Sequence, residues 1–190
     1  MTVGVLALQG AFAAHTTKLV GLGIDSVEIR QPSQLDDVDA LIMPGGESTT
    51  MSMLLESSGL FDAVAARLAD GMAAFGTCAG MILLSADIQD GREDQRSFAS
   101  LDVTVQRNGY GRQIDSFETE IEVVGLDEPA HAVFIRAPRI VEFGSEVEPL
   151  ATARGDVVLV RQGNVMAAAF HPELSNDDRI HRLFLESVAY

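Results

Sequence analysis

Short strand-like segments alternate with helix-forming stretches through the first half of this chain. Residues 3–8, 40–43 and 73–75 are apolar runs too short for buried helices, and residues 26–29 form a further strand-like segment. The stretches between them with helical patterns are residues 12–22, 48–55 and 60–69. Strands that alternate with helices form parallel sheets covered on both faces. The first half therefore predicts a mainly parallel sheet flanked by helices.

The second half is richer in strands and predicts added antiparallel pairs. The strand-like runs are residues 101–105, 118–123, 132–135, 140–143, 157–160 and 165–170. Residues 162–164 predict a turn between the last two runs, and residues 178–188 predict a closing helix with Ile180, Leu183, Phe184 and Val188 on one face. The polar residues 89–97 predict a surface loop. We expect an α/β three-layer sandwich that forms a single domain over residues 1–190.

Charge and termini exclude several classes of function. The 28 acidic residues outnumber the 13 Lys and Arg, and the net charge of -15 repels nucleic acid. The N-terminus lacks a secretory signal, and its apolar run is too short to span a membrane, so we expect a cytoplasmic protein. One cysteine cannot form an internal disulfide, and no Cys or His cluster has metal-site spacing. We expect neither a metal nor a cofactor.

Residues 76–80 (GTCAG) place the single cysteine between a strand and a helix. This small-x-nucleophile-x-small pattern is typical of a sharp elbow, where flanking side chains would collide with neighbouring strands. At the start of the following helix, backbone N–H groups and the helix dipole favour the thiolate of Cys78. The alternative is a glycine-rich turn that contains a buried, unreactive cysteine.

His171 and Glu173 follow the last predicted strand and are separated by Pro172. Proline favours extended geometry at the preceding residue, so residues i and i+2 would face the same way. Glu173 would then bind one ring nitrogen of His171, and the other would exchange a proton with Cys78. Taken alone, such a triplet is more often a surface turn. Together with Cys78 it predicts a Cys-His-Glu triad.

Residues 44–48 (PGGES) end a predicted strand at the same sheet edge and open a helix that Ser48 would cap. The N–H groups of Gly46 and Ala79 would form an oxyanion hole. A phosphate-binding loop is the alternative, although both common glycine-rich nucleotide patterns are absent.

The remaining histidines and the basic residues give weaker signals. His15 lies one turn into the first predicted helix, whereas His131 and His181 are expected to face solvent. An arginine fork suits a ligand carboxylate, and the mid-chain candidates are Arg107, Arg112, Arg136 and Arg139. Arg112 and Arg139 are equally consistent with ordinary surface residues. Lys18, the only lysine, has no assigned role.

Taken together, these motifs resemble the class I glutamine amidotransferases, and within them the glutaminase subunits of pyridoxal 5'-phosphate synthase. The resemblance spans nearly the whole chain and is carried by residues 6–11, 44–50, 76–80, 107–108, 110–113, 134–138 and 170–174. The elbow and the His-Pro-Glu triplet indicate only the class. Residues 8–11, 46–50 and 135–138 indicate the subfamily.

The resemblance implies hydrolysis of L-glutamine to glutamate and ammonia by Cys78, with His171 and Glu173 as its relay. The implied substrate contacts are Gly46, Glu47, Ser48, Arg107, Ile135 and Arg136. Gln9 would lie near the interface with a (β/α)8 synthase subunit, which uses the ammonia to build the cofactor within a hetero-oligomer. The family gives no role for residues 89–97.

Three other functions remain open at this point. The chain could be a glutaminase subunit that serves another acceptor, a free-standing γ-glutamyl hydrolase, or a noncatalytic scaffold with the same fold. The subfamily segments disfavour the first two, and the intact set of Cys, His and Glu disfavours the scaffold.

Overall fold

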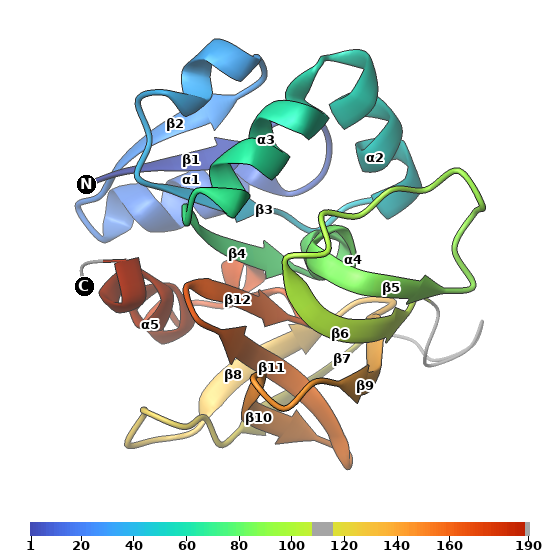
Figure 1. The fold of residues 1–190 in the computed structure, drawn as a ribbon. Helices are drawn as coiled ribbons and strands as arrows, with labels where there is room; N and C mark the ends of the chain where they lie inside the picture. The colour runs from blue at the N-terminus through green and yellow to red at the C-terminus, as the bar shows by residue number, and fades with distance from the viewer. Residues whose placement is uncertain (108–115, 189–190) are drawn as a thin grey trace.

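A seven-stranded sheet forms the centre of the protein in a computed structural model that describes residues 1–107 and 116–188. The strands lie in the order β10-β11-β12-β4-β3-β1-β2 (Figure 1). The five from β12 to β2 pair in parallel. They are β1 (Thr2–Leu6), β2 (Asp25–Ile29), β3 (Ala40–Met43), β4 (Ala73–Thr77) and β12 (Val165–Ala168). The predicted mainly parallel sheet is confirmed.

Helices cover both faces of this sheet. Helix α1 (Phe12–Gly21) joins β1 to β2, whereas α2 (Ser48–Ser57) and α3 (Leu60–Ala69) join β3 to β4 in the opposite direction across the sheet. Since such connections are right-handed, α1 lies on one face and α2 and α3 lie on the other. Helix α4 (Ala79–Leu84) packs beside α2, and α5 (Arg179–Val188) lies on the face of α1. Strands β3, β4 and β12 are therefore buried along their whole length.

The second half adds the expected antiparallel strands. Strands β11 (Asp156–Gln162) and β10 (Glu148–Ala153) extend the sheet beyond β12. A three-stranded sheet contains β5 (Ser85–Gln89), β6 (Leu101–Gln106) and β9 (Arg139–Phe143), and β7 (Phe117–Ile121) pairs with β8 (Ala130–Phe134). Strands β5 and β10 are absent from the prediction. Both expose several of their residues, and β10 contains Pro149, so neither has a clear buried pattern.

The closing helix α5 buries a different set of residues from the predicted one. Its buried residues are Ile180, His181, Phe184 and Leu185, whereas Leu183 and Val188 are only partly buried. The prediction that His181 faces solvent is wrong. Its side chain packs edge-on against Phe75 of β4, with 6.0 Å between the ring centroids. Of the helices in the described part of the chain, none is long and apolar enough to cross a membrane.

Candidate active site

Four segments that follow parallel strands meet at one edge of the sheet. Strands β3, β4 and β12 are neighbours, with β1 beside β3, so their carboxyl ends lie together. The segments that follow them contain Gln9 after β1, Gly45 and Gly46 after β3, Cys78 after β4, and His171 after β12. This edge is where parallel α/β sheets bind ligands. The candidate triad therefore lies where the topology favours a site.

The turn from β4 into α4 holds Cys78 in a strained conformation, with φ 51° and ψ -104°. A positive φ is uncommon for a residue with a side chain and persists only where surrounding packing enforces it. The packing is very close, because a Cβ on Gly80 would lie 2.0 Å from the Met43 carbonyl oxygen. The Cys78 N–H donates to the Ala168 carbonyl of β12 at 2.8 Å. The elbow predicted from residues 76–80 is present.

His171 contacts Glu173 through a turn rather than through an extended strand. Strand β12 ends at Ala168, two residues before its predicted end, and Pro172 begins the 3₁₀ helix η2 (Pro172–Leu174). His171 Nδ1 lies 2.7 Å from Glu173 Oε1, and the His171 N–H donates to the Val133 carbonyl at 2.8 Å. The predicted contact forms, but the extended geometry used to predict it is wrong. Proline instead starts the 3₁₀ turn, a position that needs no N–H donor.

The environment of His171 favours its imidazolium form. Burial lowers the pKa of His171, but hydrogen bonds to Cys78 and Glu173, together with their charges, outweigh burial and raise that pKa to about 10. The Glu173 side chain is fully buried, so its charge acts on His171 without screening by water. This arrangement suits a thiolate and imidazolium pair at neutral pH.

The loop after β3 lies directly against this pair. A Cβ on Gly45 would lie 2.3 Å from His171 Cε1 and 3.4 Å from Cys78 Cβ. The next residue, Gly46, is exposed, while Gln9 Oε1 accepts the Glu47 N–H at 2.8 Å. Ala79 is the first residue of α4, so its N–H has no intrahelical partner. The predicted oxyanion residues Gly46 and Ala79 thus flank the nucleophile on two different segments.

Glu47, rather than Ser48, caps α2. Its carboxylate accepts from the Thr50 N–H at 2.7 Å and from the Thr49 N–H at 3.4 Å. The same carboxylate lies 2.8 Å from Arg107 Nη2. Burial raises the pKa of Glu47, but the bonds from Thr50 and Thr49 and the charge of Arg107 outweigh it and lower that pKa. Two predicted substrate contacts, Glu47 and Arg107, are therefore already paired with each other.

The polar segment 89–97 packs against the start of α2. Its first residue belongs to β5, and the exposed remainder is a loop, as predicted. Gln95 Nε2 donates to Ser48 Oγ at 3.1 Å, and Thr49 Oγ1 donates to Gln95 Oε1 at 3.1 Å. Arg96 donates through its N–H to Ser52 Oγ at 3.0 Å. This loop orients the predicted substrate contact Ser48, a role that no pattern in the sequence indicates.

The turn after β8 brings Ile135 and Arg136 to the site. The Ile135 carbonyl oxygen lies 4.0 Å from Cys78 Sγ, and Arg136 has a positive φ of 45°. Both residues are exposed, so their main chain is accessible beside the nucleophile. Arg139 instead lies away in an ion pair with Asp156, at 2.7 Å. Arg112 and the matched residues 110–113 lie outside the described part of the chain.

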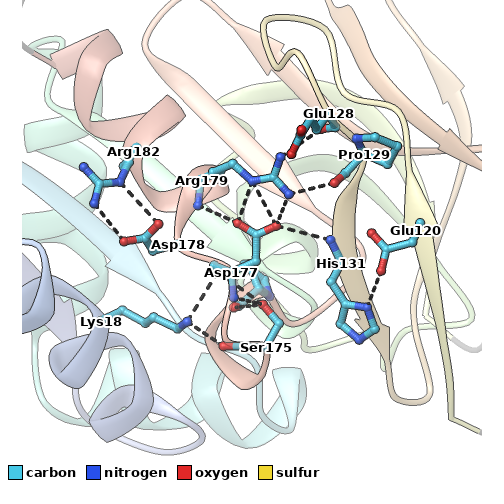
Figure 2. Close-up of polar contacts among 11 residues, drawn as sticks. Lys18, Glu120, Glu128, Pro129, His131, Ser175, Asp177, Asp178, Arg179 and Arg182 are labelled. Carbon is cyan, nitrogen blue, oxygen red and sulfur yellow. Dashed lines mark hydrogen bonds and ion pairs between the residues drawn. The ribbon is translucent and has the colours of Figure 1, made fainter.

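Lys18 anchors the segment that follows the triad (Figure 2). Its Nζ donates to the carbonyls of Ser175 and Asp177, at 2.5 and 3.3 Å. Asp177 in turn pairs with Arg179, which donates to the Glu128 and Pro129 carbonyls. The only lysine therefore has a structural role that was not predicted from its sequence context.

His131 lies beside this segment and is only partly exposed, so the expectation that it faces solvent holds in part. It is held between Glu118 at 3.0 Å and Glu120 at 2.8 Å. Hydrogen bonds to these two carboxylates raise the pKa of His131. Among residues 1–107 and 116–188, no group of three or more His, Cys, Asp or Glu side chains is placed to hold a metal ion.

Comparison with known proteins identifies relatives over nearly the full length. The model of the SNO glutamine amidotransferase family matches residues 5–190. The protein named pyridoxal 5'-phosphate synthase subunit PdxT from Nocardioides sp. is 52% identical, and the match covers 98% of this chain and 96% of that protein. The protein of the same name from Herpetosiphon aurantiacus is 54% identical, with 97% and 99% covered.

Solved structures agree with this relationship. A crystal structure described as a glutamine amidotransferase has a TM-score of 0.93 and 48% identity, and 99% of each chain is covered. A glutamine amidotransferase from Thermotoga maritima has a TM-score of 0.62 at 12% identity, covering 100% of this chain and 94% of that one. The second likeness is one of fold alone.

The tight elbow makes a prediction about stability. Gly80→Ala should lower the free energy of unfolding by roughly 3 kcal/mol, because the new Cβ would collide with the backbone of β3. Gly21→Ala is the matched control, since a Cβ there meets nothing within 4 Å and should stabilise α1 by about 0.5 kcal/mol. Urea unfolding followed by circular dichroism measures both, because the chain has no tryptophan. Equal midpoints for Gly80→Ala and the wild type would contradict the packing described.

Proposed function

Because the chain belongs to the SNO glutamine amidotransferase family, we propose that it hydrolyses L-glutamine with Cys78 as nucleophile and passes the ammonia to a synthase subunit. Residues 1–190 act as one glutaminase domain, and His171 and Glu173 form the relay. One observation carries this proposal: His171 lies 2.7 Å from the buried Glu173 where the strand ends meet, and its interactions with Cys78 and Glu173 raise its pKa. Clustered groups with a strongly raised pKa are typical of catalytic sites.

The reaction follows from the positions of these groups. Cys78 Sγ attacks the side-chain amide carbon of glutamine and forms a C–S bond, while the N–H groups of Gly46 and Ala79 hold the developing oxyanion. His171 then donates its proton to the amide nitrogen, the C–N bond breaks, and ammonia leaves. Water attacks the resulting thioester with His171 as base, which releases glutamate and restores the thiol.

Substrate binding uses the groups around the exposed side of this site. Arg107 holds the charged amino-acid end of glutamine, and it is positioned for this by its contact with Glu47. Ser48 is positioned by Gln95. Main-chain groups of Ile135 and Arg136 complete the contacts beside Cys78. Because Glu47 and Arg107 already hold each other in place, less side-chain entropy is lost when substrate binds to them.

The acceptor is a (β/α)8 synthase subunit that builds pyridoxal 5'-phosphate, the vitamin B6 cofactor, within a hetero-oligomer. The names of relatives about 50% identical over their full length support this. Ammonia released into water at neutral pH becomes ammonium, which has no lone pair for attack, so an enclosed passage to the partner is required. Gln9 is our candidate for the interface because it contacts the oxyanion loop. We assign the protein to the cytoplasm, where the single thiol stays reduced.

The first test is glutaminase activity of the wild type and of Cys78→Ala, each with and without the cognate synthase. We expect turnover that rises when the synthase is added and falls by roughly a thousandfold or more in the variant. Partner-independent turnover would favour a free-standing hydrolase. Turnover retained by Cys78→Ala would contradict the assigned nucleophile, and no turnover in any mixture would favour a scaffold.

The raised pKa of His171 makes a prediction about pH. Since that pKa is about 10, the imidazolium, and with it a positive charge beside Cys78, persists through neutral pH. Alkylation of Cys78 by iodoacetamide should therefore slow less between pH 8 and pH 6 in the wild type than in His171→Gln, where the slowing approaches the limit of about tenfold per pH unit for one titrating group. Mass spectrometry reads a single adduct because the chain has one cysteine. Parallel pH profiles for the two proteins would rule out the ion pair.

A further inference from the structure

A buried polar network lies directly behind the proposed triad. His15 of α1 and His181 of α5 are both fully buried, as is Thr77 at the end of β4. His15 Nδ1 lies 3.0 Å from His181 Nε2, and His15 Nε2 lies 3.2 Å from Thr77 Oγ1. Two helices and the central strand thus supply polar groups to one point inside the protein. Buried polar groups of this kind need mutual hydrogen bonds to offset the loss of water.

This network reaches the carboxylate of Glu173. Its Oε1 is bound by His171, whereas its Oε2 is buried and has no hydrogen-bond partner of good geometry among the described residues. His15 Nε2 faces that oxygen at 3.4 Å. A buried carboxylate oxygen without a hydrogen-bond donor lowers the stability of the fold, by up to several kcal/mol. His15 Nε2 is therefore the ring nitrogen that can offer this oxygen an N–H group.

The hydrogen-bond pattern decides which nitrogen of His15 carries the proton. With the proton on Nδ1, the lone pair of Nε2 would face the carboxylate, and two acceptors would oppose each other. With the proton on Nε2, an N–H group donates to Thr77 Oγ1 and lies beside Glu173 Oε2 at 3.4 Å, and Nδ1 accepts from the Nε2–H of His181. The second arrangement is the favourable one, because an N–H group and not a lone pair then faces the buried carboxylate. In this arrangement His181 Nδ1 is an acceptor, and like Glu173 Oε2 it has no hydrogen-bond partner among the described residues.

Both histidines of the network remain neutral. Burial lowers the pKa of His15 well below its ordinary value, and the charges of His181 and His171 lower it further. Burial, and then the charge of Lys18, lower the pKa of His181 to about 4, despite the opposing charge of Asp178. A neutral donor stabilises the carboxylate without cancelling its charge. A second imidazolium beside Glu173 would instead compete with His171 for that charge.

We propose that His15 is a positioning residue for the triad, which places its Nε2–H beside Glu173 Oε2 and is itself held in that tautomer by His181. The inference rests on the proposed function, because it assigns His15 a role through Glu173 and His171. Like other groups that orient a catalytic residue, His15 should affect turnover without affecting substrate affinity.

Two substitutions separate this role from simple packing. The amide of Gln reaches the place of Nε2, whereas the shorter amide of Asn reaches only the place of Nδ1. In complexes with the synthase, His15→Gln should keep glutaminase kcat within about threefold of wild type, and His15→Asn should lower it about 10- to 100-fold. The KM for glutamine should stay within about twofold in both. His131→Gln is the matched control for loss of a histidine, and it should behave as the wild type.

A second readout needs no turnover. In the free chain, iodoacetamide labelling of Cys78 at pH 6 should fall about tenfold or more in His15→Asn relative to pH 8, and it should recover in His15→Gln. Urea midpoints by circular dichroism establish that both variants are folded. Equal labelling and kcat in the Asn and Gln variants would overturn the proposal, and so would loss of the fold in both, which would mark His15 as a packing residue.

The proposed function and the role of His15 fail on different results. If Cys78→Ala hydrolyses glutamine as fast as the wild type, the proposed function fails whatever the His15 variants do. If turnover depends on Cys78 but His15→Asn matches the wild type in kcat and labelling, only the role of His15 is wrong.

Discussion

The close approach of α4 to β3 fixes the geometry on which the candidate site depends. With no side chain at Gly80, the backbone of α4 lies against the Met43 carbonyl, where a Cβ would be only 2.0 Å away. This contact forces the chain to turn at Cys78 and gives that residue its positive φ. The strain has a cost of about 1–3 kcal/mol, which the buried strands on either side of β4 offset. The turn fixes the position of Cys78 at the edge of the sheet where β3 and β12 also end.

A buried charge is the second constraint. Glu173 is fully buried yet raises the pKa of His171, so it acts as an anion in a region of low dielectric. An isolated carboxylate would be unstable there and needs donors on both oxygens. His171 supplies one donor, and the network of His15 and His181 faces the other oxygen. Lys18 holds the backbone just after this carboxylate, through the Ser175 carbonyl.

The parts of the fold that could be predicted are those where local pattern and burial agree. The bounds of β3 are as predicted because all four of its residues are apolar and buried, and those of α3 because its apolar spacing is helical. The nucleophile elbow was predictable because the glycines around Cys78 occupy positions where a side chain would collide with a neighbouring strand. By contrast, β5 and β10 each pair with the next strand along the chain, and their own residues carry no alternating apolar pattern that would mark them as strands.

The polar contacts that hold the site were harder to predict, because they join residues far apart in sequence. Ser48 looked like the helix cap, but Glu47 takes that role because it can also reach Arg107, 60 residues away. His181 was expected to face solvent, and its contacts with His15 on α1 and with Phe75 on β4 account for its burial. Patterns in a single sequence predict the local secondary structure that a residue favours. They do not predict which residue, distant in sequence, its side chain will contact.

The site joins buried groups to exposed ones. Cys78, His171 and Glu173 are buried, and the N–H groups of Cys78 and His171 donate to neighbouring strands. The groups proposed for substrate recognition, Gly46, Glu47 and Arg136, are exposed and lie on loops. Gln9 connects the two sets, since it bonds the Glu47 N–H while its own segment leads into α1, the helix that carries His15. A partner that contacts Gln9 would therefore act on the oxyanion loop directly, whereas the buried relay behind it would keep its geometry.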